Sequence, residues 1–167
     1  MALLSRVADR MYWAARYVER AEDSARVLRA YGDVLADLPT SSTRWSPLVT
    51  ISGSDVKLPA VVGSDEVQVA QFLIADRDHP NSIVNAVEQC RENLRTCREV
   101  LPREAWQTVN DLSIYVRGAA VTSVDRRRRD RFLSRVIDES RRLDGVMIST
   151  MTRDEVFEMW RLGRYIE

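Results

Sequence analysis

Near the N-terminus, two arginines and two acids lie close enough together to bind or transform a polar substrate. The segment is YWAARYVERAED, and the four side chains are Arg16, Glu19, Arg20 and Asp23. A guanidinium group donates two parallel hydrogen bonds to a carboxylate, so Arg16 and Arg20 could hold the carboxylate of a substrate. On a helix Arg16, Arg20 and Asp23 would share one stripe. The segment is therefore a candidate polar site.

Apolar side chains continue this stripe in both directions, which bears on whether the charged residues are buried and paired or exposed to solvent. They are Tyr12, Val27 and Val34, and they lie opposite the main apolar face of the expected helix. A helix that is apolar on two sides is usually surrounded by other helices, so its central charges must be paired. The alternative is a set of local ion pairs on a solvated surface. Those pairs would be Arg16 with Glu19 and Glu22 with Arg26.

The end of the sequence repeats part of this charged segment. RYVE at 16–19 recurs as RYIE at 164–167, and a tryptophan precedes each copy, Trp13 and Trp160. The recurrence indicates that the last helix is a structural repeat of the first. We therefore expect Arg164 and Glu167 to face the first helix and to line a polar seam with its charges.

A second candidate is the connector DRDHPNS at 76–82. Pro80 lacks a backbone donor and disfavours a helical conformation at His79, so the segment separates two helices. Its polar side chains could form a substrate-binding loop, or they could cap the next helix, as Asp, Asn and Ser commonly do. The residues concerned are Asp76, Asp78, Asn81 and Ser82. Both interpretations stay open at this point.

Other chemistries have weaker support in the residues. A ferritin-like dimetal site needs Glu-x-x-His motifs on two helices, whereas the chain has a single histidine, followed by proline. At an all-carboxylate Mg²⁺ site of Glu19, Asp23 and Glu167, neighbouring arginines would compete for the acids. Cys90 and Cys97 fall on an apolar helical stripe, where a thiol is usually inert. We expect no metal, no cofactor and no Gly-rich phosphate loop.

Charge and hydropathy exclude several classes of partner. The run DRRRRDR at 125–131 could bind phosphate or RNA, but it has no interleaved aromatic residues and nearby acids dilute its field, which favours a solvated helix start. Lys+Arg 25 balance Asp+Glu 25, so no net charge draws the chain to nucleic acid or to an anionic membrane. No apolar run approaches the ~18 residues of a membrane span, and no secretion signal is recognisable. These observations predict a cytoplasmic protein.

The elements that must position these residues are helices. The 167 residues are 45% hydrophobic, which suffices for one domain, 1–167, with a real core. Apolar residues recur with helical spacing over about 5–37, 82–101, 102–116, 132–147 and 152–167, with shorter segments at 47–51 and from Ser64. Thr152 and Glu155 could form a capping box for the last helix. The pattern predicts an all-α, antiparallel bundle of five or six helices.

Four segments together resemble the bacterial Alpha-E family, which is named for a Glu-Arg motif. They are LSRVADRMYWAARYVERAED, DRDHPNSI, CRENLR and TRDEVFEMWRLGRYIE, and they occur in the family's order over essentially the whole chain. The resemblance implies an all-helical protein in which Glu19 and Arg20 are the naming pair. It also implies a second helical portion, so we expect this chain to be the first half of a longer two-part bundle, truncated at its C-terminus. His79 and Pro80 depart from the family's shorter Asn-Pro pairing.

The resemblance further implies a role in amide or peptide metabolism, because family proteins are often encoded beside ATP-grasp ligases and transglutaminase-like enzymes. We expect a helical accessory or scaffold protein that acts with one of these partners. A first alternative is an enzyme that uses the Arg/Glu seam. A second is a self-associating structural protein, a homo-oligomer in which an apolar face pairs with another copy. The residues alone leave open whether the chain is an enzyme.

Overall fold

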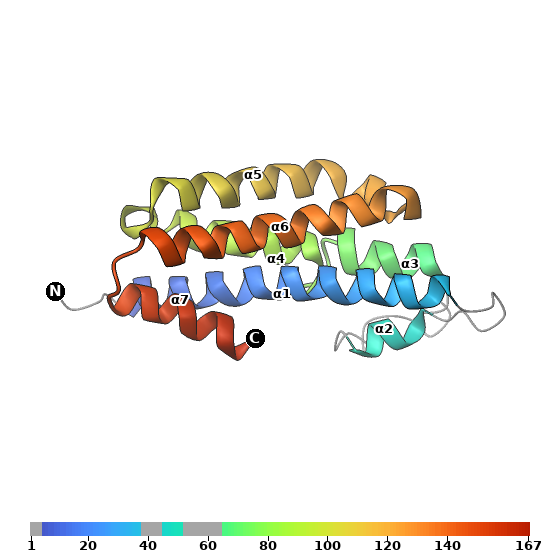
Figure 1. The fold of residues 1–167 in the computed structure, drawn as a ribbon, viewed down its shortest axis with the longest axis horizontal. Coiled ribbons are helices and arrows are strands. Elements are labelled where there is room, and N and C mark those ends of the chain that lie inside the picture. The colour runs from blue at the N-terminus through green and yellow to red at the C-terminus, as the bar shows by residue number, and fades with distance from the viewer. Residues whose placement is uncertain (1–4, 38–44, 52–64) are drawn as a thin grey trace.

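The computed structural model describes residues 5–37, 45–51 and 65–167, and every regular element in these ranges is a helix (Figure 1). The long helices are α1 (Ser5–Ala36), α4 (Ile83–Arg95), α5 (Arg103–Ala119), α6 (Arg126–Thr150) and α7 (Glu155–Ile166). The short ones are α2 (Ser46–Ile51) and α3 (Glu66–Ala70), which continues into the π-helical turn η3 (Gln71–Ala75). Two 3₁₀ turns, η4 (Arg98–Val100) and η5 (Val121–Val124), flank α5. The all-α prediction is confirmed.

Helices α1, α4, α5 and α6 lie side by side as a bundle (Figure 1). Helix α1 packs against α4 and α6, and α5 packs against the same two helices. Consecutive long helices run in opposite directions, as short connections predict. Helix α7 packs on α1 and runs in the same direction as α1, so it adds an outer layer to the bundle. No described helix has the length and hydropathy needed to cross a bilayer.

The core is divided into two clusters along the bundle. The first joins the C-terminal half of α1 to α2, to the α3–η3 segment and to parts of α4, α5 and α6, with Leu28, Leu48, Ile74 and Phe132 among its buried members. The second joins the N-terminal half of α1 to α7 and to other parts of the same three helices, with Met11, Leu94 and Trp160 among its members. Different additional elements thus pack on the two halves of α1: α7 on the N-terminal half, and α2 with the α3–η3 segment on the C-terminal half.

Helix α1 has the predicted second covered face only in its first half. Helix α7 packs there, and Tyr12 is partly buried. Farther along the same stripe, Val27 is 39% exposed and Val34 is 58% exposed. The prediction that α1 is surrounded on both faces is therefore wrong for its C-terminal half, because the described residues leave these two valines open to solvent.

Helix α7 begins differently from the sequence-based expectation. The Asp154 side chain is the N-cap and accepts hydrogen bonds from the backbone N–H groups of Val156 at 3.0 Å and Phe157 at 3.2 Å. The capping box predicted for Thr152 with Glu155 is wrong, because the cap lies two residues later. Aspartate is as strong an N-cap as threonine, and only the local backbone conformation decides between them.

Candidate functional site

Helices α1 and α7 are in backbone contact where Gly163 meets Ala15. A Cβ atom added to Gly163 would lie 2.3 Å from the backbone oxygen of Tyr12 and 2.7 Å from the Cβ of Ala15. Any larger residue at 163 would have to push the two helices apart. The RYVE and RYIE copies align Gly163 with Ala15, so the two halves of the repeat cross at equivalent positions.

The arginine of each copy pairs with the glutamate of the other. Arg16 Nε lies 2.7 Å from Glu167 Oε2, and Arg164 Nε lies 2.5 Å from Glu19 Oε2. This exchange is the pattern of a two-fold axis, in which residue i contacts j and the equivalent of j contacts the equivalent of i. The four side chains are mostly buried, with exposed fractions between 12% and 24%. The structure thus brings the charges of the two copies together, as the repeat predicts.

Glu22 forms the centre of a further set of ion pairs beside this crossing. Its side chain is fully buried, and it binds Arg26 one turn along α1. It also lies 3.1 Å from Arg141 on α6 and 3.4 Å from Arg164 on α7. The sequence predicts only the local pair of Glu22 with Arg26. The other two partners come from distant segments, so Glu22 connects three helices.

The two glutamates of the seam differ in their electrostatics. Burial opposes the charged form of Glu167, but hydrogen bonds from Arg20 and Arg16 outweigh it, so the pKa of Glu167 lies below its usual value. Burial raises the pKa of Glu19, and Arg164 does not cancel this effect because other carboxylates lie nearby. Those carboxylates are Asp23, Glu22 and Asp144. Protonation at acidic pH therefore begins on the Glu19 side of the crossing rather than at Glu167.

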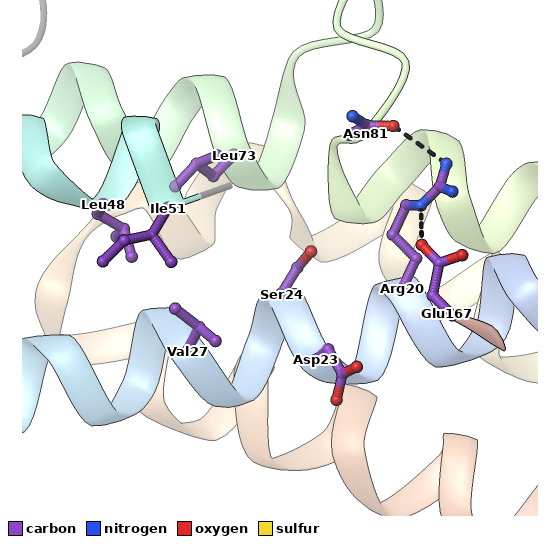
Figure 2. Close-up of a pocket in the computed structure, with 9 residues that line it drawn as sticks. All are labelled: Arg20, Asp23, Ser24, Val27, Leu48, Ile51, Leu73, Asn81 and Glu167. Carbon is purple, nitrogen blue, oxygen red and sulfur yellow. Dashed lines mark hydrogen bonds and ion pairs between the residues drawn. The ribbon is translucent and has the colours of Figure 1, made fainter. Parts of the chain in front are cut away.

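Arg20 connects this network to the loop at 76–82. Its Nε lies 2.5 Å from Glu167 Oε1, and its Nη1 donates a hydrogen bond to Asn81 Oδ1 at 3.1 Å (Figure 2). These three side chains form one edge of an open pocket of about 400 Å³. The other residues that line it are Asp23, Ser24, Val27, Leu48, Ile51 and Leu73. Polar residues from both candidate segments thus meet at one pocket.

Only one of the four loop candidates reaches this pocket. Asp76 accepts a hydrogen bond from the backbone N–H of Asp78 at 2.8 Å, which shapes the turn. Ser82 accepts a hydrogen bond from the N–H of Asn85 at 3.2 Å and caps α4. The capping interpretation is therefore correct for Ser82, whereas Asp76 stabilises the turn within the loop and Asn81 lies at the pocket.

Asp23 is the seam candidate that stands apart from the ion pairs. Its side chain accepts no hydrogen bond from the described residues and lies on the rim of the pocket (Figure 2). Burial raises its pKa, while Arg26 acts in the opposite direction. Of the six seam residues, Asp23 is thus the one that forms no ion pair with a described residue.

The remaining features singled out in the sequence have structural roles. Arg129, in the basic run, is 6% exposed and binds Glu66 at 2.8 Å and the Val124 carbonyl at 2.7 Å, so the solvated interpretation is wrong for this one arginine. Cys97 is buried, and burial raises the pKa of its thiol to about 11, so the inert reading of this cysteine is supported. Within the described ranges no three His, Cys, Asp or Glu side chains are grouped to hold a metal ion.

These features define a class: an all-α bundle with an extra helix held on its first helix by reciprocal Arg–Glu pairs. Residues 3–167 match the family described as Alpha-E, a predicted alpha-helical domain with a conserved ER motif. The chain belongs to the Alpha-E family. Glu19 and Arg20 form the single Glu-Arg dipeptide of the sequence, and both are paired with α7. No curated protein and no solved structure matches the chain.

Proposed function

We propose that this chain is a bacterial helical accessory or scaffold protein that acts with an ATP-grasp type ligase in amide or peptide metabolism. Support for a structural rather than catalytic role comes from the α1–α7 crossing, whose charged groups bind one another. Both carboxylate oxygens of Glu167 are taken, by Arg16 and Arg20, and Glu22 is buried among three arginines. Glu167 and Glu22 therefore hold helices together and have little capacity left for a substrate. Because the ligase needs ATP, the proposal places the protein in the cytoplasm.

Helix α7 offers a surface for the partner. Leu162, Tyr165 and Ile166 are 45%, 76% and 51% exposed, and their spacing places them on one helical face. Exposed apolar side chains that cluster are typical of the centre of a protein interface, and tyrosine is among the residues that contribute most there. The ion pairs and the Gly163 contact fix the opposite side of α7 on α1. We therefore place the ligase, or a transglutaminase-like partner, on this face.

Copurification tests the proposal. The chain is expressed with the ATP-grasp ligase encoded beside it, and the complex is captured through a tag on the chain. We expect the wild type to retain the ligase and Tyr165→Glu to lose it. Val121→Glu is the matched control, because Val121 is 69% exposed on η5, away from α7. If the wild type retains neither the ligase nor a neighbouring transglutaminase-like enzyme, the proposal is wrong.

Self-association is distinguished in the same preparation. If the α7 face binds a second copy of the chain instead, light scattering shows a dimer for the wild type and a monomer for Tyr165→Glu. That result would replace the ligase partner with a homo-oligomer.

An enzyme of amide or peptide metabolism is the second candidate, and the pocket beside Arg20 favours it. Arg20→Ala separates the two candidates, since Arg20 borders both the pocket and the ion pairs. Loss of amide turnover in the coexpressed system at an unchanged melting temperature would support the enzyme. A lowered melting temperature would support the structural network.

A further inference from the structure

The pocket lies beside the second half of α1, between that helix, α2, η3 and the loop that ends at Ser82 (Figure 2). Its volume of about 400 Å³ falls in the range of small-molecule sites. The polar lining lies at one end, where Arg20, Asn81 and Glu167 meet, and the apolar lining lies at the other. The pocket therefore suits a ligand with a polar group at one end and an apolar group at the other.

Asn81 presents a hydrogen-bond donor to this space, because Arg20 fixes its orientation. A guanidinium group can only donate, so the Asn81 atom that it binds must be the carbonyl oxygen. The amide nitrogen of Asn81 then points away from Arg20, and Figure 2 shows it on the side that faces Leu73. This nitrogen donates to no described residue, so its two N–H groups are available to an acceptor.

Ser24 supplies the complementary group. It lies one turn after Arg20 on α1, and its hydroxyl points toward the loop that carries Asn81 (Figure 2). A serine hydroxyl both donates and accepts, and this one has no hydrogen-bond partner among the described residues. Together the Asn81 nitrogen and the Ser24 hydroxyl offer a donor and an acceptor to one small polar group.

The apolar end is formed by side chains that α1, α2 and η3 bring together. Leu48 and Leu73 are buried at 1% and 6% exposed, and Val27 and Ile51 are 39% and 65% exposed. An aliphatic group seated here would cover the two exposed side chains, which gives the apolar part of a ligand a hydrophobic driving force. The same contact explains how Val27 could be covered although no described helix packs on it.

The loop that carries Asn81 is held in place from several sides. Asn85 Nδ2 donates to the carbonyl oxygens of Arg77 at 2.8 Å and His79 at 2.7 Å. His79 is buried and stacks on Phe72 of η3, with ring centroids 4.0 Å apart. A π-helical turn such as η3 is rare and is frequently found at functional sites. The polar end of the pocket is thus preformed, which reduces the cost of binding there.

We propose that this pocket binds a secondary amide with an aliphatic side chain, that is, a small peptide or an acylated amino acid. The Asn81 amide nitrogen donates to the carbonyl oxygen of the ligand, and Ser24 Oγ accepts from its N–H. The aliphatic side chain lies against Val27, Leu48, Ile51 and Leu73. The inference goes beyond the scaffold role, because it assigns a ligand that the chain binds whether or not a ligase is its partner.

A titration followed by nuclear magnetic resonance tests the inference, with N-acetyl-L-leucinamide as the probe and the full chain labelled with ¹⁵N. We expect saturable shifts at the backbone N–H groups of Ser24, Leu73 and Asn81. N-acetylglycinamide, which lacks the aliphatic side chain, should bind at least about tenfold more weakly, since the apolar end is then empty.

Asn81→Asp tests the donor directly. Aspartate keeps the oxygen that binds Arg20 but replaces the N–H groups with a second acceptor, so we expect at least about tenfold weaker binding at an unchanged melting temperature. Asn110→Asp is the matched control, because Asn110 also accepts from an arginine, Arg91 Nε at 3.0 Å, and lies outside the pocket. It should bind the probe as the wild type does.

Ser24→Ala provides an independent variant, and we expect it to bind several-fold more weakly even if Asn81→Asp does not fold. The inference is wrong if the wild type shows no saturable shifts up to the solubility of the probe, or if the shifts lie away from the pocket. It is equally wrong if folded Asn81→Asp, or Ser24→Ala when the former does not fold, binds as tightly as the wild type. None of these results depends on whether the ligase copurifies, so each proposal fails separately.

Discussion

The two halves of helix α1 carry similar polar residues and use them differently. At Ala15 the backbone of α7 is in contact with α1, and the charges around that point bind one another across the crossing. At Ser24, about two and a half turns later, the neighbouring elements leave a pocket of about 400 Å³, and polar groups there keep unused hydrogen-bonding capacity. The distance to the neighbouring element, rather than residue type, separates a structural network from a candidate binding site.

The largest expected effect is the loss of the buried carboxylate at the crossing. Glu22→Ala leaves three arginines without their shared partner, so we expect the free energy of unfolding to fall by about 3 kcal/mol. Glu92→Ala is the control, because Glu92 and Arg95 form an ion pair in which both side chains are about half exposed. It should cost less than about 0.5 kcal/mol. Equal losses in chemical denaturation would remove the distinction between the buried network and a surface pair.

Gly163→Ala tests the backbone contact itself. The added Cβ would meet the Tyr12 oxygen at 2.3 Å, so α7 must move, and we expect a loss of about 2 kcal/mol despite the better helix propensity of alanine. Gly145→Ala is the matched control on α6, where nothing lies within 4 Å of the added atom. That change should stabilise the protein by about 0.5–1 kcal/mol. Thermal unfolding that shows the same sign for both variants would contradict the close approach.

A pH titration distinguishes the ion pairs from mere packing. The pKa of Glu167 is lower in the folded state than in the unfolded chain, so its contribution is present above about pH 4.3 and is lost as the pH falls through the folded-state pKa. We expect Glu167→Gln to be less stable than the wild type by about 1 kcal/mol at neutral pH and nearly equal to it in acid. A difference that stays constant across this range would mean that the charge of Glu167 contributes nothing.

The smallest expected effect lies at the pocket. Ile51→Asn changes a side chain that is 65% exposed, so the free energy of unfolding should change by less than about 0.5 kcal/mol. Leu48→Asn, on the same helix but 1% exposed, should cost several-fold more. If both variants lose the same free energy of unfolding, the apolar end of the pocket is part of the core. The contrast between the two halves of α1 is then lost.

Much of the fold could be predicted because helical periodicity is a local property. The spacing of apolar residues located α1, α5 and α7 to within about three residues, and it located the start of α4, which ends at Arg95 rather than at 101. The repeat predicted that Arg164 and Glu167 would meet the charges of α1, because each copy carries an arginine and a glutamate three positions apart. Which arginine pairs with which glutamate came only from the structure. These features need only a pattern in the chain and no knowledge of the tertiary structure.

The remaining features of the fold and the site depend on contacts between segments that are far apart in the sequence, and no local pattern encodes such contacts. Arg141 on α6 has no spacing relation to Glu22, so the buried centre of the network was missed. Which of the polar residues in DRDHPNS faces the pocket is decided by Arg20, which binds Asn81 across 61 positions of sequence. The exposure of Val34 likewise follows from the position of α7, which covers only the first half of α1.

A double-mutant cycle on Arg164 and Glu19 tests the central claim most directly. The free energy of unfolding is measured for the wild type, Arg164→Gln, Glu19→Gln and the double variant at neutral pH. Because the two side chains are in contact at 2.5 Å and are 16% and 18% exposed, we expect a coupling energy of at least about 1 kcal/mol. If the losses of the two single variants sum to the loss of the double variant within about 0.3 kcal/mol, the reciprocal pairs do not hold α7 on α1.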